Sequence, residues 1–250
     1  MNNIIEITDD FEIEDEPLKS TSKFQSRKIV FCIDISDEMY MTMKATANGG
    51  IKDPHLYNSP RLEIVQRYLK RYVATNQLIG NDEDEYAIIL LTDVAIWSLD
   101  FTSNRTIFNT KIDAISLDSL RNYNDFDTQS LADTLKAHLN VQNSNFYYHT
   151  ILIYSRSTVI PAAFRDNAFQ NLRKRTNFML DVLFLHNGLA ASKLMQSVYD
   201  FWSELDDDNR PGWYYESNLF SGKEKVAIAL SQLIGHPACR GHQDRINNTL

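Results

Sequence analysis

Acidic and hydroxyl side chains follow an apolar run closely near the start of the chain. Residues 28–38 read K-I-V-F-C-I-D-I-S-D-E, so Asp34, Ser36 and Glu38 stand two residues apart at the end of a predicted buried strand. Open α/β sheets bind ligands at the carboxyl ends of their parallel strands. Carboxylate and hydroxyl oxygens are the ligands that a hard cation such as Mg²⁺ prefers. The segment therefore indicates part of a metal site, or its remnant, at the rim of a sheet.

The spacing of these residues resembles the metal-ion-dependent adhesion motif of von Willebrand factor A domains, which begins D-x-S-x-S. Asp34 and Ser36 match the first two positions, and Glu38 replaces the second serine. The family's site also uses a threonine just before a helix, and Asp127 or Thr128 can occupy that position. Four of the five expected positions therefore have a candidate oxygen ligand.

The fifth position departs from the family pattern. The strand expected over residues 149–154 ends in Tyr154-Ser155-Arg156, which places a guanidinium where the family has an aspartate. Clustered carboxylates need a counter-charge when they are partly buried. We therefore hypothesise that Arg156 pairs with Asp34 or Glu38 and takes the place of the cation. On this hypothesis the site is a degenerate remnant, and we expect no metal and no cofactor.

An enzymatic interpretation of the same segment is weaker. Haloacid-dehalogenase-like phosphatases also place a nucleophilic aspartate at the end of a first strand. They need a second aspartate two residues later, where this chain has Ser36, and Asp37 comes one residue too late. The sequence contains no G-x-S-x-G, Walker, G-x-G-x-x-G or H-E-x-x-H motif. We therefore expect a protein that is not an enzyme.

Other histidines and cysteines give little support for a metal centre. The pattern His236-x-x-Cys239-x-x-His242 offers three ligands at a spacing that can suit zinc, but no second pair supplies a fourth. Three further histidines have no obvious carboxylate partner in the sequence and are expected to fill the core or the surface: His138, His149 and His186. The two cysteines, Cys32 and Cys239, do not form a disulfide framework and are typical of a reducing compartment.

The composition predicts one sizeable α/β domain with tails. The chain has 250 residues, of which 43% are hydrophobic. No apolar run approaches the roughly 20 residues that span a bilayer, and residues 1–10 lack the basic region and apolar core of a signal peptide, so an intracellular, soluble protein is expected. Residues 1–26 contain seven acids and are expected to be a disordered arm. Without those acids the chain has 26 acids against 25 bases, which argues against a nucleic-acid-binding surface.

Apolar strands and amphipathic helices alternate from residue 28 onward. Strands are expected over residues 28–34, 86–91, 94–99, 149–154, 178–185 and 212–216, and helices after Ser59-Pro60, over 105–115, from Asp127 or Thr128, and over 162–174, 190–205 and 222–234. Only Thr92 and Asp93 separate the second and third strands, which must therefore be antiparallel neighbours. This order predicts a Rossmann-like α/β fold with a mostly parallel sheet, one antiparallel edge strand and helices on both faces.

Three strings narrow the von Willebrand A-like resemblance to one intracellular family. They are T-I-L-I-Y-S-R-S at residues 150–157, D-V-L-F-L-H-N-G at 181–188 and L-I-G-H-P-A-C-R at 233–240. In this order they resemble the scaffold subunits of the BRISC and BRCA-one A deubiquitinase complexes, the MERIT-forty family. The match runs from about Lys28 to the C-terminus and leaves the acidic arm outside it.

The resemblance implies a non-catalytic subunit that binds the UEV-domain protein BRE. Through BRE, the subunit would stabilise an assembly in which a metalloprotease and its Abraxas-type partner cleave lysine-sixty-three-linked polyubiquitin. It also implies roles in ubiquitin signalling and in DNA-damage repair, in both cytoplasm and nucleus. No direct contact with nucleic acid or membrane is expected.

The family docks the segment after its last helix on BRE, and here that segment is residues 236–250. Pro237 stops the preceding helix, and the remaining residues are too polar and too few to form another packed element. His236, Pro237 and Arg240 match the family's H-P-x-x-R-like string, which implies that they contact the partner. Residues 27–235 then form the von Willebrand A-like domain. The alternative function is a magnesium-dependent, ligand-binding A domain that uses Asp34 and Ser36.

Overall fold

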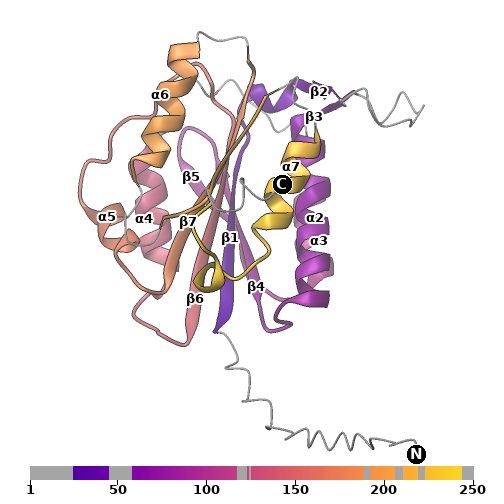
Figure 1. Cartoon of the computed structure of the whole chain (residues 1–250), viewed down its shortest axis with the longest axis vertical. Helices are drawn as coiled ribbons and strands as arrows, with labels where there is room; N and C mark the ends of the chain where they lie inside the picture. The colour runs from indigo at the N-terminus through magenta and orange to yellow at the C-terminus, as the bar shows by residue number, and fades with distance from the viewer. Residues whose placement is uncertain are drawn as a thin grey trace, which may run out of the picture.

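The computed structural model describes residues 25–44, 58–116, 123, 125–188, 192–205, 211–218 and 223–243. The acidic arm lies outside the described residues up to residue 24, as do residues 244–250 of the predicted tail. The described strands and helices between residues 26 and 232 form a central sheet with helices packed around it (Figure 1). No helix in the described ranges is both long and apolar enough to cross a bilayer.

The main sheet has six strands. They are β1 (Ser26–Asp34), β4 (Glu85–Leu91), β5 (Ala95–Thr102), β6 (Phe146–Tyr154), β7 (Phe178–His186) and β8 (Tyr214–Asn218), in the order β5-β4-β1-β6-β7-β8. Strand β5 pairs antiparallel with β4, and the other neighbours are parallel. The predicted mostly parallel sheet with one antiparallel edge strand is therefore confirmed.

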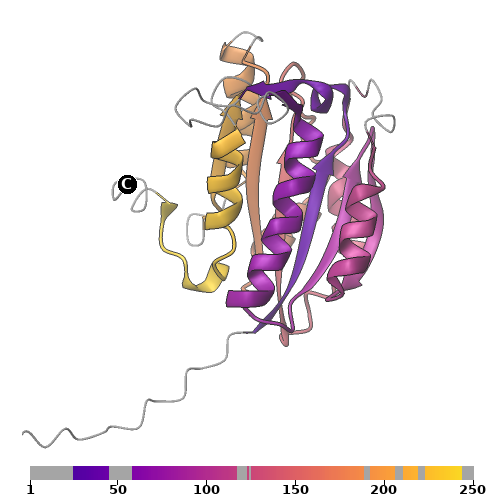
Figure 2. The same cartoon turned by 90° about the vertical axis from the view of Figure 1, so that its right-hand side faces the viewer.

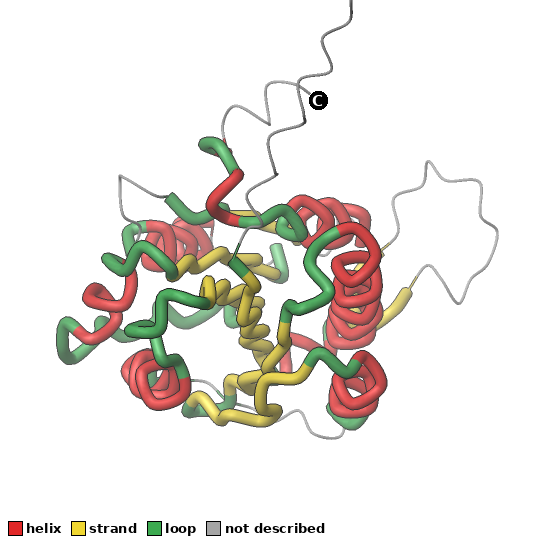
Figure 3. The backbone as a smooth tube through the Cα atoms, turned by 90° about the horizontal axis from the view of Figure 1, so that it is seen from below, coloured by secondary structure: helices red, strands yellow, loops and turns green. Residues whose placement is uncertain are grey.

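Helices cover both faces of this sheet (Figures 2 and 3). One face carries α2 (Arg61–Ile79), α3 (Arg105–Asp113) and α7 (Lys223–Gln232), and the other carries α4 (Thr128–His138), α5 (Ala168–Arg173) and α6 (Ser192–Ser203). Successive residues of a strand point to opposite faces, so β1 sends Phe31 into the first apolar core and Cys32 into the second. Phe31 packs against the ring of Tyr72, with centroids 5.2 Å apart.

Three short elements around the first helix are absent from the sequence prediction. A short 3₁₀ helix η1 (Asp37–Tyr40) follows β1, and a small antiparallel pair forms between β2 (Thr42–Lys44) and β3 (Asn58–Pro60). Ser59 and Pro60 therefore belong to β3, and α2 begins at Arg61 without a side-chain cap. Three-residue strands leave no periodic pattern that a sequence alone can reveal.

Helix α5 is shorter than the predicted range of residues 162–174. Two hydrogen bonds fix the residues before it as a loop, because Gln129 accepts from the backbone N–H of Arg165 at 2.9 Å and Asp166 accepts from that of Ala168 at 2.8 Å. These bonds replace the helical hydrogen bonds that the apolar pattern suggests. The loop crosses the start of α4, where the predicted position Thr128 lies.

Candidate functional site

Asp34 is the last residue of β1 and lies fully buried at the carboxyl end of the parallel strands. Its Oδ1 accepts a hydrogen bond from the backbone N–H of Ser36 at 2.9 Å, and its Oδ2 accepts one from that of Ser155 at 3.0 Å. The hydroxyl oxygens of Ser36 and Ser155 lie 3.2 Å apart. One carboxylate therefore joins the loops that follow β1 and β6.

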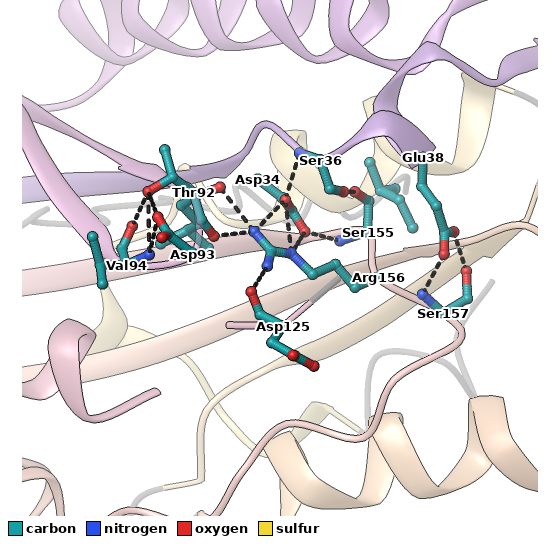
Figure 4. Close-up of polar contacts among 12 residues, drawn as sticks. Asp34, Ser36, Glu38, Thr92, Asp93, Val94, Asp125, Ser155, Arg156 and Ser157 are labelled. Carbon is teal, nitrogen blue, oxygen red and sulfur yellow. Dashed lines mark hydrogen bonds and ion pairs between the residues drawn. The ribbon is translucent and has the colours of Figure 1, made fainter. Parts of the chain in front are cut away.

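Arg156 supplies a positive charge beside this carboxylate (Figure 4). Its Nε lies 3.3 Å from Oδ1 of Asp34, and its side chain is 3% exposed. The rest of the guanidinium donates to backbone carbonyls, to Asp125 at 2.6 Å, to Leu91 at 3.0 Å and also to Thr92. The structure thus places Arg156 against Asp34, the first of the two partners named in the sequence hypothesis.

Glu38, the second carboxylate of the motif, has a separate set of partners. It accepts hydrogen bonds from the backbone N–H of Ser157 at 2.8 Å and from the Ser157 hydroxyl, and it lies 3.6 Å from Nη1 of Arg61. Burial raises the pKa of Glu38, and the hydrogen bonds from Ser157 and the charge of Arg61 offset only part of this shift. Burial likewise lowers the pKa of Arg61 to about 10. The counter-charge of Glu38 is therefore Arg61 and not Arg156.

Thr128 stands at the first position of α4 but has a different role from the family's threonine. Its hydroxyl donates to the carbonyl of Ala162 at 2.6 Å, which ties α4 to the loop before α5. Asp127 caps the helix by accepting from the backbone N–H of Gln129 at 3.1 Å, and it pairs with Arg165 at 3.0 Å. Both residues therefore serve the helix start, as a cap and a tether.

These residues do not fit a divalent cation in this arrangement. Both oxygens of Asp34 already accept hydrogen bonds, and the guanidinium of Arg156, 3.3 Å from Oδ1, would repel a cation beside the same carboxylate. Across the described part of the chain, no group of three or more His, Cys, Asp or Glu side chains is placed to hold a metal ion. The side chains of His236, Cys239 and His242 lie in the described part and do not form such a group.

A second buried polar cluster lies in the middle of the sheet, and the sequence prediction did not include it. Asp181 of β7 is fully buried, and its Oδ2 lies 2.5 Å from Nε2 of His149 on β6 and 2.7 Å from Nη2 of Arg240. Its Oδ1 accepts from the backbone N–H of Trp213 at 2.8 Å. His149 does fill the core, as expected, and it has a carboxylate partner that the sequence did not make obvious. An aspartate inside the apolar run F-M-L-D-V-L-F-L-H is the signal that could have indicated this cluster.

The charges of this cluster are set by burial and by Arg240. Burial lowers the pKa of His149 to about 4, so its imidazole is neutral at pH 7. Burial favours the protonated form of Asp181, but Arg240 and then His149 outweigh it and hold the pKa of Asp181 at about 2. At neutral pH the pair that carries charge is therefore Asp181 with Arg240. Removing one member of such a buried pair costs about 3–5 kcal/mol, since the other charge is left without compensation.

The predicted tail, as far as Gln243, folds back onto the domain. Pro237 is buried at the start of a 3₁₀ turn, η3 (Pro237–Cys239), and the ring of His236 lies 4.9 Å from that of Tyr147. The guanidinium of Arg240 stacks 4.5 Å from the ring of Trp213, and its side chain is 7% exposed. The segment was expected to be too polar and too short to form another packed element, and this expectation is wrong for residues 236–243.

Two further hydrogen-bonded contacts hold this segment. The indole Nε1 of Trp213 donates to the carbonyl of Gly241 at 3.1 Å. The side-chain amide of Gln243 accepts from the backbone N–H of Tyr214 at 2.8 Å and donates to its carbonyl at 2.9 Å. Because β8 is an edge strand, Gln243 satisfies backbone groups that would otherwise face solvent or a neighbouring chain.

The sheet order, the two helical layers and the rim at the end of β1 define a von Willebrand A-like α/β protein. A von Willebrand factor type A structure from Catenulispora acidiphila matches with a TM-score of 0.54 at 12% identity, over 85% of this chain and 43% of that chain. The protein BatB from Bacteroides thetaiotaomicron matches with a TM-score of 0.55 at 13% identity, over 84% of this chain and 98% of that chain. Likeness at this level of identity shows the fold alone.

Curated vertebrate proteins are similar over most of the sequence. The Xenopus laevis protein named BRISC and BRCA1-A complex member 1 is 23% identical over 222 residues, which are 86% of this chain and 65% of that protein. The human protein of that name is 23% identical over 230 residues, 89% of this chain and 68% of that protein. The Danio rerio protein is 22% identical over 231 residues, 89% of this chain and 60% of that protein. No family model matches the chain.

The chain is a distant relative of these complex members, so the resemblance read from the three sequence strings is confirmed. It spans about 60% to 68% of the length of these relatives. Their shared name describes a member of a complex and not an enzyme.

Proposed function

We propose that the chain is a non-catalytic scaffold subunit of a deubiquitinase complex of the BRISC or BRCA1-A type. In this proposal it binds the UEV-domain subunit BRE and stabilises an assembly whose metalloprotease, with its Abraxas-type partner, cleaves lysine-sixty-three-linked polyubiquitin. Such a subunit would act in ubiquitin signalling and in the response to DNA damage, in the cytoplasm and in the nucleus. The observation that carries the proposal is the similarity to named complex members over 86% to 89% of the chain.

The geometry of the rim supports a non-catalytic role. A nucleophilic aspartate needs an oxygen that is free to attack a substrate, but Asp34 is fully buried and each of its oxygens accepts a backbone hydrogen bond. Arg156 neutralises the same carboxylate. We therefore interpret Asp34, Ser36, Glu38 and Arg156 as a structural remnant of an adhesion-type metal site.

A binding measurement with purified components tests the scaffold proposal. The full chain should bind BRE with the same affinity in the presence and absence of excess chelator, because no metal takes part. Deleting residues 236–250, the proposed docking segment, should weaken binding strongly. Full affinity in the deleted chain would show that the docking segment lies elsewhere, and no binding of the intact chain would overturn the proposal.

The magnesium-dependent alternative makes the opposite prediction about metal. A ligand that binds only the native state raises its apparent stability by mass action. Because a guanidinium lies beside Asp34, we expect millimolar Mg²⁺ to leave the thermal midpoint of the chain unchanged. A saturable rise that disappears in Asp34→Ala would favour the ligand-binding A domain over the scaffold.

A further inference from the structure

The segment over residues 236–243 has an inner and an outer side, and we call it the latched segment. Pro237 and the side chain of Arg240 are turned inward and buried. Ala238, Cys239 and His242 are exposed. Pro237 and Arg240, two of the three residues that match the H-P-x-x-R-like string, thus hold the segment, and a partner can reach the exposed residues beside them.

Arg240 is the centre of the inner side. It pairs with Asp181 at 2.7 Å and stacks on the ring of Trp213 at 4.5 Å. The same indole donates to the carbonyl of Gly241, one residue further along. Gln243 adds two hydrogen bonds to the edge of β8. Two side chains of the segment, Arg240 and Gln243, and two of the domain, Asp181 and Trp213, therefore fix the path of the segment.

Release of the segment would leave Asp181 without its cation. The remaining partner, His149, is fully buried, and burial disfavours its charged form. A partner that binds an extended form of the segment would have to compensate for a buried, unpaired carboxylate as well as for the lost contacts of Trp213. A partner that binds the segment in place avoids both penalties.

The segment also forms one continuous surface with the domain. A cavity of about 290 Å³ is lined from the segment by the exposed residues Ala238 and His242 and by edges of the inward-turned Pro237 and Arg240. From the sheet side it is lined by Tyr147 and Thr176, among others. Tyr147 is the second residue of β6, and Thr176 comes two residues before β7. The surface therefore lies toward the amino ends of the strands, away from the rim that holds Asp34.

We infer that the partner binds the latched segment as a folded surface on the domain, and that Arg240 and Asp181 are positioning residues for that surface. This inference rests on the proposed function, since it concerns the same docking segment. It replaces a direct contact between Arg240 and the partner with an internal one. Contacts to the partner come from the outer side of the segment and from the adjoining domain residues.

The substitution Asp181→Asn tests this inference, because the two modes of binding predict opposite changes in the dissociation constant for BRE. The variant loses the charge that holds Arg240, yet it changes no exposed residue. If it leaves the segment latched in one molecule in ten, the dissociation constant for BRE rises about tenfold, because the binding-competent fraction falls by that factor. If the partner instead takes Arg240 from a released segment, the same change frees Arg240 and binding becomes tighter. Tighter or unchanged binding would overturn the inference.

Asp34→Asn is the matched control for this experiment. It also removes the charge of a fully buried aspartate paired with an arginine, but at the carboxyl end of β1. Compared at a temperature where both variants are folded by circular dichroism, Asp34→Asn should bind BRE like the unmodified chain. Equal weakening by the two changes would trace the effect to general destabilisation and contradict the inference.

A second variant covers the case in which Asp181→Asn does not fold. Trp213→Phe keeps a buried ring but removes the donor to Gly241, and it should also raise the dissociation constant. Unchanged affinity in this variant would count against the inference. The proposed function fails separately, since in that case the unmodified chain does not bind BRE.

Discussion

The buried charge of Asp34 is stabilised by the groups that surround it. Its carboxylate accepts two backbone hydrogen bonds and pairs with Arg156, which itself donates to three backbone carbonyls. The guanidinium thus connects the ends of β1, β4 and β6, as a metal ion would connect loops. Its role is to hold these three strand ends together.

Replacing Asp34 with alanine should therefore destabilise the fold and leave Arg156 buried without a counter-charge. We expect a loss of about 3–5 kcal/mol in the free energy of unfolding, measured by urea denaturation. The additional change Arg156→Met should cost less in the Asp34→Ala background than in the unmodified chain, because the two residues are coupled. Additive effects would show that the pair does not stabilise the rim.

The sequence was sufficient to predict that Arg156 lies beside Asp34 or Glu38, but not that Asp181 pairs with Arg240. Asp34 directly follows an apolar run and Arg156 comes two residues after Tyr154 ends another, so their placement at strand ends follows from strand periodicity. Asp181 and Arg240 are 59 residues apart, and no local pattern links them. Such pairs depend on how the chain returns to the sheet, which only the tertiary structure reveals.

The neighbouring strands β6 and β7 are joined by the buried contact between His149 and Asp181 as well as by their backbone hydrogen bonds. The burial of this histidine makes stability depend on pH. The unfolded chain protonates His149 as the pH falls through about 6.5, whereas the folded chain does so only near its pKa of about 4. The unfolded state therefore binds more protons in this window, and stability falls as the pH is lowered through it.

The pH prediction is tested with His149→Gln. Each such proton contributes a slope of up to about 1.4 kcal/mol per pH unit. The variant should lose the slope due to His149 between pH 6.5 and 4 and keep that due to His236, whose pKa burial also lowers to about 4. Denaturation curves at several pH values measure it. An unchanged slope in the variant would contradict a neutral, buried His149.

Element boundaries were predictable where periodicity was long and unreliable where it was short. The strand and helix order from β1 to α7 follows from apolar runs and helical spacing. The start of α5 depends on Gln129, a residue of α4, which contacts Arg165 and Asp166 just before α5. A pattern within residues 162–174 cannot reveal contacts made by another helix. Pairing between β2 and β3 involves three residues on each side, too few for a pattern.

The whole molecule has two different ends. The carboxyl end of the strands, where A-type domains bind ligands through a metal, is here closed by Arg156. Toward the amino ends, the latched segment joins Tyr147 and Thr176 in an open surface. In the proposed scaffold, the amino end would therefore bind the protein partner, because Arg156 closes the metal-site position at the carboxyl end.

Affinity purification of the chain from its native source, with identification of the co-purifying proteins, tests whether it is a scaffold of a deubiquitinase complex. We expect recovery of a UEV-domain subunit and a metalloprotease deubiquitinase in stable amounts, unaffected by chelator in the wash. Recovery without any deubiquitinase subunit, or of a ligand released by chelator, would contradict it.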